Sequence, residues 1–212
     1  MIFSSREDIA SAALARLGEP PLSDLDEPSD AARRVRQLYE LTVLSLLSSY
    51  RWTWATVRTP LQRDGAAVPR NEWRHAYRLP DLQTDRVGKP IELWAERGSS
   101  PLVAGSYELE GDHVLCDQDG LIAVYVRRLH ERQWPGYFAN LAVEALAAKL
   151  ALPITENASK EQHHLALAFG SPAEAGRGGL HRVATQADSV GNPTASLLDD
   201  HDPIVAARLG YS

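Results

Sequence analysis

The strongest constraint on the fold of this chain is a long amphipathic helix predicted over residues 29–49. Apolar side chains recur there every three or four residues, which is the spacing of one helical face, and arginines and other polar residues occupy the opposite side. Ser29 follows Pro28 as a suitable N-cap, and Asp30 lies at the positive end of the helix dipole. We therefore expect one long helix that begins at Ser29 and packs by a single face.

A shorter helix is predicted before it, over about residues 6–17. Ser4 or Ser5 can cap its first turn, and Gly18 supplies a left-handed C-cap. Two consecutive prolines follow in the next turn and prevent the helix from continuing.

Between residues 51 and 130 the pattern changes to period-two alternation and turns, which is typical of strands. The alternation is clearest over residues 121–129, where both faces begin apolar, so we expect this strand to be central in its sheet. Because the strands are short, a small sheet or barrel is expected. The other expected strands are residues 53–61, 75–79 and 89–96 and a hairpin over residues 107–116.

Helical periodicity returns over residues 137–152, which are apolar nearly all round. Such a helix is expected to be buried between other helices or between subunits. Pro153 is expected to stop it, and Thr155 or Asn157 can cap a fourth helix that runs to about residue 169. The sequence after that helix contains no long periodic segment.

The predicted fold class is α+β: an α-helical bundle from both sequence ends, with an inserted small β-rich subdomain and an extended C-terminal tail. The expected division is 1–50 for the N-terminal helices, 51–133 for the β-rich subdomain, 134–170 for the C-terminal helices and 171–212 for the tail.

Charge and cysteine content exclude several classes of protein. The net charge is −6 and no Lys/Arg-rich block is present, which argues against a protein that grips nucleic acid through its phosphates. The acidic charge is compatible with a protein that DNA only passes, because an acidic surface would not bind the DNA strand. The single cysteine, Cys116, rules out an intrachain disulfide and a zinc cage of several thiolates. With no signal region and no apolar run of membrane-spanning length expected, synthesis in a reducing cytoplasm is the default expectation.

Four stretches of the sequence, taken in order, resemble one protein family. The first reads LG…SDLDEPSDAAR…LYE…LLSSYRWTWA over residues 17–55. The others are WRHAYRLP at 73–80, YELEGDHVLCDQDGLIAVYVRR at 107–128 and FANLAVEALAAKLALPITEN at 138–157. This order resembles the tail tubular protein A family, the head-to-tail adaptors of short-tailed bacteriophages. The resemblance covers roughly residues 6–169; after Phe169 the chain departs from the long charged helix that members usually continue.

The resemblance implies a structural protein of the virion, made in the cytoplasm of the host bacterium. It implies a homo-oligomeric ring of about twelve copies beneath the portal protein and above the tail nozzle, with tail fibres as a further possible neighbour. Double-stranded DNA would cross the central channel without sequence-specific binding, and the ring would help to retain packaged DNA before ejection. No cofactor, metal, membrane anchor or enzymatic activity is implied.

Glu144 is the candidate for an alternative, enzymatic function. It lies on an otherwise apolar helix, and with Glu156 or Asp119 it could form the carboxylate pair of a wall-degrading, muramidase-like enzyme. A lone glutamate on such a helix more often pairs with a nearby cation, and Lys149 is close along the chain. We therefore expect no catalytic residue.

Metal sites are also not expected. His113 and Cys116 would lie on opposite faces of a strand, and adjacent His163 and His164 point about 100° apart on a helix. His181 adds to His163 and His164 a small group of histidines, which does not by itself make a set of converging ligands. The run from Asp117 to Gly120 begins like a calcium loop but has Arg128 where such a loop needs glutamate.

The candidate functional residues are those of an interface. Aromatic and arginine side chains contribute most of the binding energy of protein interfaces, so Trp134 and Tyr137, at the junction of strand and helix, are candidates, as is Arg33 on the long helix. Arg33, Arg34 and Arg36 would also be the basic helix of a small DNA-binding regulator, a weaker alternative given the net charge. The tail is expected to be an arm that becomes ordered on a partner through Ile204, Leu209 and Tyr211.

Overall fold

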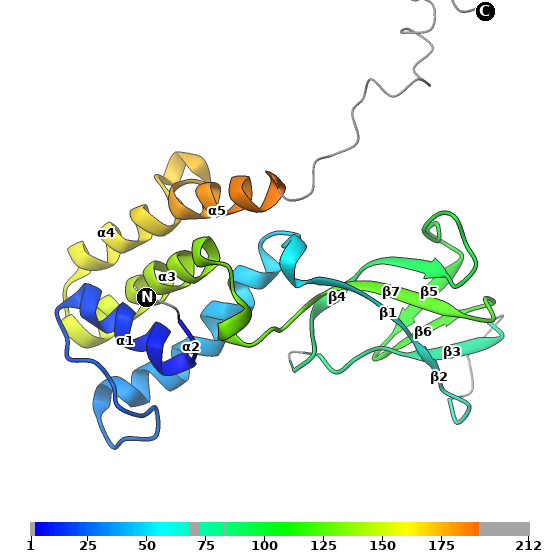
Figure 1. Ribbon diagram of the computed structural model, residues 1–212, viewed down its shortest axis with the longest axis horizontal. Helices are drawn as coiled ribbons and strands as arrows, with labels where there is room; N and C mark the ends of the chain where they lie inside the picture. Colours follow the sequence, from blue (N-terminus) through cyan, green and yellow to red (C-terminus); the bar gives the residue numbers. More distant parts are fainter. Residues whose placement is uncertain (1–2, 68–72, 83, 191–212) are drawn as a thin grey trace, which may run out of the picture.

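A computed structural model describes residues 3–67, 73–82 and 84–190, and it confirms the α+β class. A helical unit formed from both ends of the described chain lies beside a β unit formed from its middle, so the molecule is elongated (Figure 1). The helices are α1 (Arg6–Leu17), α2 (Asp30–Ser48), η1 (Thr53–Ala55), η2 (Glu131–Gln133), α3 (Gly136–Thr155), α4 (Ala158–Phe169), η3 (Pro172–Glu174) and α5 (Gly179–Val190). The strands are β1 (Thr56–Pro60), β2 (Gln62–Arg63), β3 (His75–Arg78), β4 (Arg86–Ala95), β5 (Tyr107–Glu110), β6 (His113–Cys116) and β7 (Leu121–Arg127).

The first helix begins and ends, and the second helix begins, where the capping residues predict. Ser5 forms a capping box with Asp8, and Gly18 takes the left-handed conformation, with φ of 84°, that ends α1. The Ser29 side chain accepts a hydrogen bond from the backbone N–H of Ala32 and so starts α2. Local capping therefore fixes the two ends of the turn between α1 and α2.

Helix α3 is the centre of the helical unit, where it packs against α1, α2, α4 and α5. This packing within one chain accounts for a helix that is apolar nearly all round, so its composition does not require a second subunit. On length and apolar composition alone α3 could cross a membrane, but 67% of its most apolar window is buried under the other helices, as in the core helix of a soluble protein.

The prediction that Pro153 stops this helix is wrong. Helix α3 continues through Pro153 to Thr155, because a proline in the last turn removes only its own N–H bond. The helix ends at Glu156, whose φ of 53° is left-handed and whose N–H donates to the Leu152 carbonyl at 3.0 Å.

The prediction of an extended tail from residue 171 is also wrong for its first part. Residues 179–190 form α5, which packs on α3 and α4 and touches η1 (Figure 1). Its buried residues, His181, Ala184 and Asp188, are spaced as one helical face, but two of the three are polar. The face by which this helix packs is therefore marked mainly by polar residues.

The β unit consists of two antiparallel sheets over one small core. One sheet has the order β1-β7-β4 and the other β2-β3-β6-β5, so the central position of β7 is confirmed. The chain passes from one sheet to the other at Leu61, whose N–H donates to the Leu121 carbonyl at 2.8 Å. The core between the sheets contains Leu61, Tyr77, Leu79, Leu93, Val114, Cys116, Leu121, Ala123 and Tyr125.

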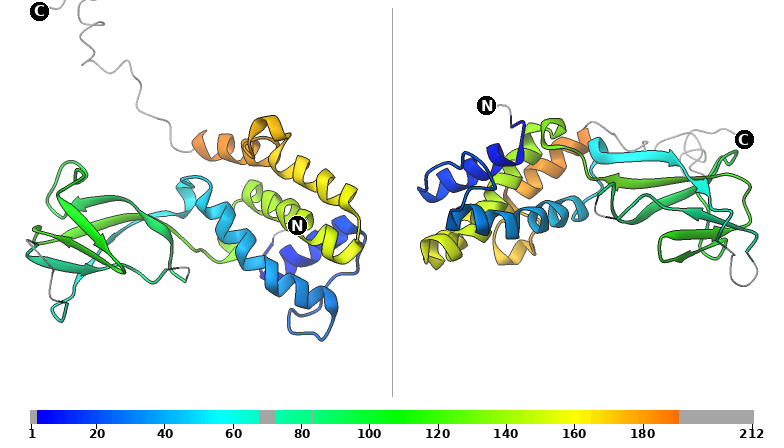
Figure 2. Two further views of the ribbon diagram at one scale, coloured as in Figure 1. Left: turned by 180° about the vertical axis from the view of Figure 1, so that it is seen from behind. Right: turned by 90° about the horizontal axis from the view of Figure 1, so that it is seen from below.

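The β unit reaches into the helical core by one pair of residues. Val87 of β4 and Val126 of β7 face each other in the register, and both belong to the core of the helical unit. The views from behind and from below show the two connections between the units, the cyan segment from α2 into β1 and the green segment from β7 to α3 (Figure 2). The two units therefore meet at a packed junction and not across an open linker.

Candidate functional site

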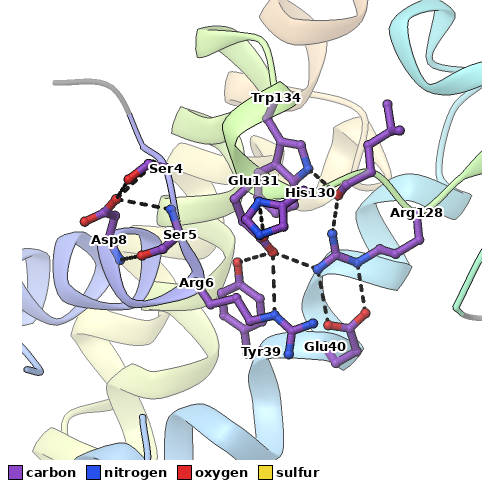
Figure 3. A network of polar contacts seen from close by, with 11 residues as sticks. Ser4, Ser5, Arg6, Asp8, Tyr39, Glu40, Arg128, His130, Glu131 and Trp134 are labelled. Carbon is purple, nitrogen blue, oxygen red and sulfur yellow. Dashed lines mark hydrogen bonds and ion pairs between the residues drawn. The ribbon is translucent and has the colours of Figure 1, made fainter. Parts of the chain in front are cut away.

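A buried polar network joins the two units (Figure 3). Arg128, one residue past the end of β7, donates from Nε and Nη2 to both carboxylate oxygens of Glu40 on α2, at 2.9 and 3.3 Å. Its Nη2 also donates to Glu131 Oε1 at 2.8 Å, and the Tyr39 hydroxyl donates to the same oxygen at 3.0 Å. Arg6 of α1 approaches that oxygen to 3.9 Å. One carboxylate, Glu131, thus draws together α1, α2 and the last strand of the β unit.

The protonation states of this network follow from its geometry. Burial opposes ionisation of Glu131, but the hydrogen bonds and charge of Arg128 outweigh it and hold the Glu131 pKa below its ordinary value. Burial also opposes the charge of Arg128, and its bonds to Glu40 and Glu131 reverse this and raise the Arg128 pKa. Burial and the Glu131 charge raise the Tyr39 pKa, so its hydroxyl stays a donor. The junction therefore holds a fixed ion pair at neutral pH.

A second polar contact also joins the two units. Arg51, just past α2, donates to Glu92 of β4 with 2.7 Å between Nη1 and Oε1. The indole of Trp94 donates to the other oxygen of Glu92 at 3.0 Å. Hydrogen bonds from Trp94 and Arg51 lower the Glu92 pKa, so this carboxylate is also charged at neutral pH.

Trp134 lies in the core of the helical unit and only 8% of it is exposed. Its indole donates to the Leu129 carbonyl at 3.0 Å, and its ring meets the ring of Phe138 edge to face. Trp52 and Trp54 contact the same Phe138 ring, so three of the five tryptophans form one aromatic cluster there. Trp134 therefore has little surface to offer a partner.

Tyr137 takes part in a buried hydrogen-bonded group that fastens α5. Its hydroxyl donates to Oδ1 of Asp188 at 2.9 Å. The backbone N–H and hydroxyl of Thr53 donate to the same carboxylate at 2.8 and 2.9 Å. Burial, with the bond to Asp188, raises the Tyr137 pKa. Asp188, which is 2% exposed, thus ties the last described helix to η1 and α3.

Arg33 lies on the exposed side of α2 and pairs with Asp30 one turn earlier. Such exposed pairs contribute little to stability, so Arg33 remains available to a partner. On the same helix Leu41 is 62% exposed, the most exposed of its apolar side chains. The other predicted contacts, Ile204, Leu209 and Tyr211, lie outside the described residues.

Glu144 is 4% exposed and bridges three helices. Arg16 of α1 approaches its Oε1 to 2.9 Å, and His164 Nδ1 of α4 lies 2.8 Å from its Oε2. The predicted pairing with Lys149 is wrong, because the partners come from neighbouring helices. Glu156 and Asp119, proposed as its partners for an enzyme, are both exposed and lie at the end of α3 and in the β6–β7 turn.

Three further histidines have polar partners. His113 lies 3.0 Å from Asp64, His75 3.2 Å from Asp119, and His181 2.9 Å from the Ser49 hydroxyl. Within residues 3–67, 73–82 and 84–190 no three His, Cys, Asp or Glu side chains converge as metal ligands.

Sequence reasoning missed the residues that organise these contacts, chiefly Glu131, Arg128 and Asp188. The signal for Arg128 and Glu131 was a pair of opposite charges three residues apart, next to a buried strand. The same pair would also fit an exposed loop. For Asp188 it was the spacing of His181, Ala184 and Asp188 as one helical face.

The four stretches that resemble the tail tubular protein A family occupy both units of the fold. Residues 17–55 run from the end of α1 to η1, residues 73–80 contain β3, residues 107–128 contain β5 to β7, and residues 138–157 lie mostly in α3. The family assignment rests on these stretches and remains a proposal. No protein-family model matches this chain, and no curated protein matches it significantly.

Proposed function

We propose that this protein is a structural head-to-tail adaptor of a short-tailed phage, forming a ring that joins the portal to the tail nozzle and continues the DNA channel. The observation that carries the proposal is the junction between two unlike units, which ion pairs hold together. The stretches that resemble the adaptor family occupy both of these units. An adaptor must present one surface to its neighbours in the ring and another to the next component. A β unit held firmly at the end of a helical body suits that task.

The exposed apolar side chains of the helical unit favour contacts between unlike faces. Leu41 lies on α2, while Leu165, Leu167 and Val183, each at least 40% exposed, lie on α4 and α5. Helix α3 separates α2 from α4 and α5 (Figure 1). When one face of a subunit meets a different face of the next, the assembly is a closed ring if the rotation per subunit fits and a filament otherwise. A ring wall made by the helical units therefore follows from the proposal.

The test is the mass of the purified protein, alone and mixed with portal rings, followed by electron microscopy of the mixture. We expect a monomer that forms a ring on the portal. Leu41→Arg should abolish the ring, and Val103→Arg, at a similarly exposed site of the β unit (73%), should not. A wild-type protein that stays monomeric and does not bind portal rings would exclude the adaptor function.

The same test can ask whether the C-terminal tail acts as an arm that binds the portal, and for this the chain should be truncated after Val190. Cutting after Phe169 would remove α5 and leave its buried partners, including Thr53 and Tyr137, without Asp188. A defect of that shorter chain would then report damage to the helical unit and not the loss of an arm.

A further inference from the structure

Helix α2 presents an apolar edge to solvent. Leu41 is exposed, and the partly exposed Leu38 and Leu44 lie one turn before and one turn after it on the same side of the helix. Around them this side of α2 carries polar residues, among them Gln37 and Ser45. We call Leu38, Leu41 and Leu44 the α2 edge. Leucines spaced in this way are the anchors by which a helix enters an apolar groove.

Such a groove lies at the end of α4 and continues into η3. It has a volume of about 540 Å³, a size that can receive the side chains of a partner helix. Glu174 and Arg177 lie beside it and carry opposite charges, so they leave little net charge at that end. We call it the α4 groove, and the side chains of its walls include Gln162, Leu165, Phe169, Ser171 and Pro172.

The α2 edge and the α4 groove of one chain cannot meet, because α3 lies between the helices that carry them (Figure 1). A second copy of the chain can bring its α2 edge to the groove without this obstacle. The two features are unlike and lie on opposite sides of the helical unit, so one copy can offer both at once.

Charge favours the same occupant in a defined register. Arg34 precedes Leu41 by seven residues on the same face of α2, about 11 Å along the helix. Glu161 lies one turn before the groove residue Leu165, and it precedes Phe169 by eight residues, about 12 Å. When the two helices lie side by side and parallel, Leu41 at Phe169 therefore brings Arg34 beside Glu161.

We propose that the α2 edge of one copy occupies the α4 groove of a second copy, with Arg34 of the first beside Glu161 of the second. Each copy then donates its edge to one neighbour and its groove to another, so the contact repeats head to tail. The inference rests on the adaptor proposal, which supplies the reason for copies to assemble, and it names the contact by which they do so.

The test is chemical cross-linking between two cysteine variants of the full-length chain. Gln37→Cys places a thiol beside the α2 edge and Gln162→Cys places one in the groove wall, while the apolar residues of both stay intact. The natural Cys116 is buried and common to all variants. The two variants are mixed with a short bismaleimide, free in solution at rising concentration and on portal rings.

We expect the mixture to give about five times the cross-linked dimer of either variant alone, because docking raises the effective concentration of one thiol at the other. Val103→Cys, at an exposed site of the β unit, replaces Gln37→Cys in the matched control and should give only the yield of the single variants. Leu41→Arg in the Gln37→Cys chain should reduce the yield to that of the control.

A charge exchange separates docking from chance collision and from misfolding. Arg34→Glu in the Gln37→Cys chain should lower the yield roughly two- to fivefold, as expected for a partly exposed ion pair. Glu161→Arg in the Gln162→Cys chain should restore it when the two altered chains are mixed. A folding defect in one chain would not be repaired by a change in the other.

The proposal is overturned if the mixture gives no more dimer than the Val103→Cys control, both in solution and on portal rings. It is equally overturned if Gln162→Cys alone links as well as the mixture, which would place groove against groove, or if Leu41→Arg leaves the yield unchanged. Rings on the portal without the expected link would remove this contact and leave the adaptor function standing. The expected link in a protein that ignores portal rings would support the contact and exclude the adaptor function.

Discussion

Arg128 and Glu131 form a buried ion pair where the β unit joins the helical unit, with 2.8 Å between Nη2 and Oε1. Their side chains are 8% and 2% exposed. Arg128 also forms an ion pair with Glu40 of α2, and Glu131 also accepts a hydrogen bond from Tyr39 of α2. This one pair therefore connects the end of β7 to α2 and to η2, which precedes α3. The orientation of the two units should therefore depend on it.

Removing one partner of this pair should be costly. Glu131→Ala leaves Arg128 buried with only Glu40 as a charged partner and removes the acceptor of the Tyr39 hydroxyl, so we expect the free energy of unfolding to fall by about 3 kcal/mol. Denaturant unfolding measures the loss. Arg33→Ala breaks an exposed pair and should change stability by no more than about 0.5 kcal/mol. Equal effects of the two variants would show that the buried network does not stabilise the junction.

Asp188→Ala should loosen α5 without unfolding the rest. The variant leaves the Thr53 N–H and the Tyr137 hydroxyl without their acceptor, and hydrogen bonds to a charged group contribute about 1.5–3 kcal/mol each. We expect faster amide hydrogen exchange over residues 179–190, with exchange in the β unit unchanged. Ser189→Ala, at the exposed neighbouring position, is the control. If α5 exchanges at the wild-type rate in Asp188→Ala, then the carboxylate does not fasten the helix.

Acid should loosen the same helix through His181. Burial, followed by the charge of Arg177, lowers the His181 pKa below its ordinary 6.5. A group with a lowered folded-state pKa contributes stability that is complete above the unfolded pKa and is lost as the pH falls through the folded one. The protein should therefore lose stability below about pH 6.5, with exchange in α5 rising first. His181→Gln cannot titrate and should show a weaker dependence over that range; an unchanged dependence would assign it to other groups.

The sequence predicted the elements whose signals are local. Capping at Ser5 and Gly18 determined both ends of α1, and capping at Ser29 determined the start of α2. The alternation over residues 121–129 predicted a central strand, which is β7. These signals depend on neighbours along the chain, which the sequence displays directly.

The contacts of the candidate site depend on residues far apart in the chain. Tyr39 and Glu131 are separated by 92 positions, and Thr53 and Asp188 by 135. No pattern in one segment predicts such a pair, because each residue alone resembles an ordinary surface residue. For the same reason the sequence predicts residues 179–190 as part of a tail, because two of the three residues that α5 buries are polar.

Glu144 decides between the structural and the catalytic alternative. Its carboxylate is buried and engaged by Arg16 and His164, as expected for a residue that joins α1, α3 and α4. We expect Glu144→Ala to lower the free energy of unfolding by about 3 kcal/mol, because Arg16 and His164 lose their common partner. Glu144→Gln keeps the shape of the side chain. We expect neither this variant nor the wild-type protein to reduce the turbidity of purified peptidoglycan. If the wild-type protein clears peptidoglycan and folded Glu144→Gln does not, then the Glu144 carboxylate is catalytic. The purely structural role that the adaptor proposal gives to Glu144 would then be wrong.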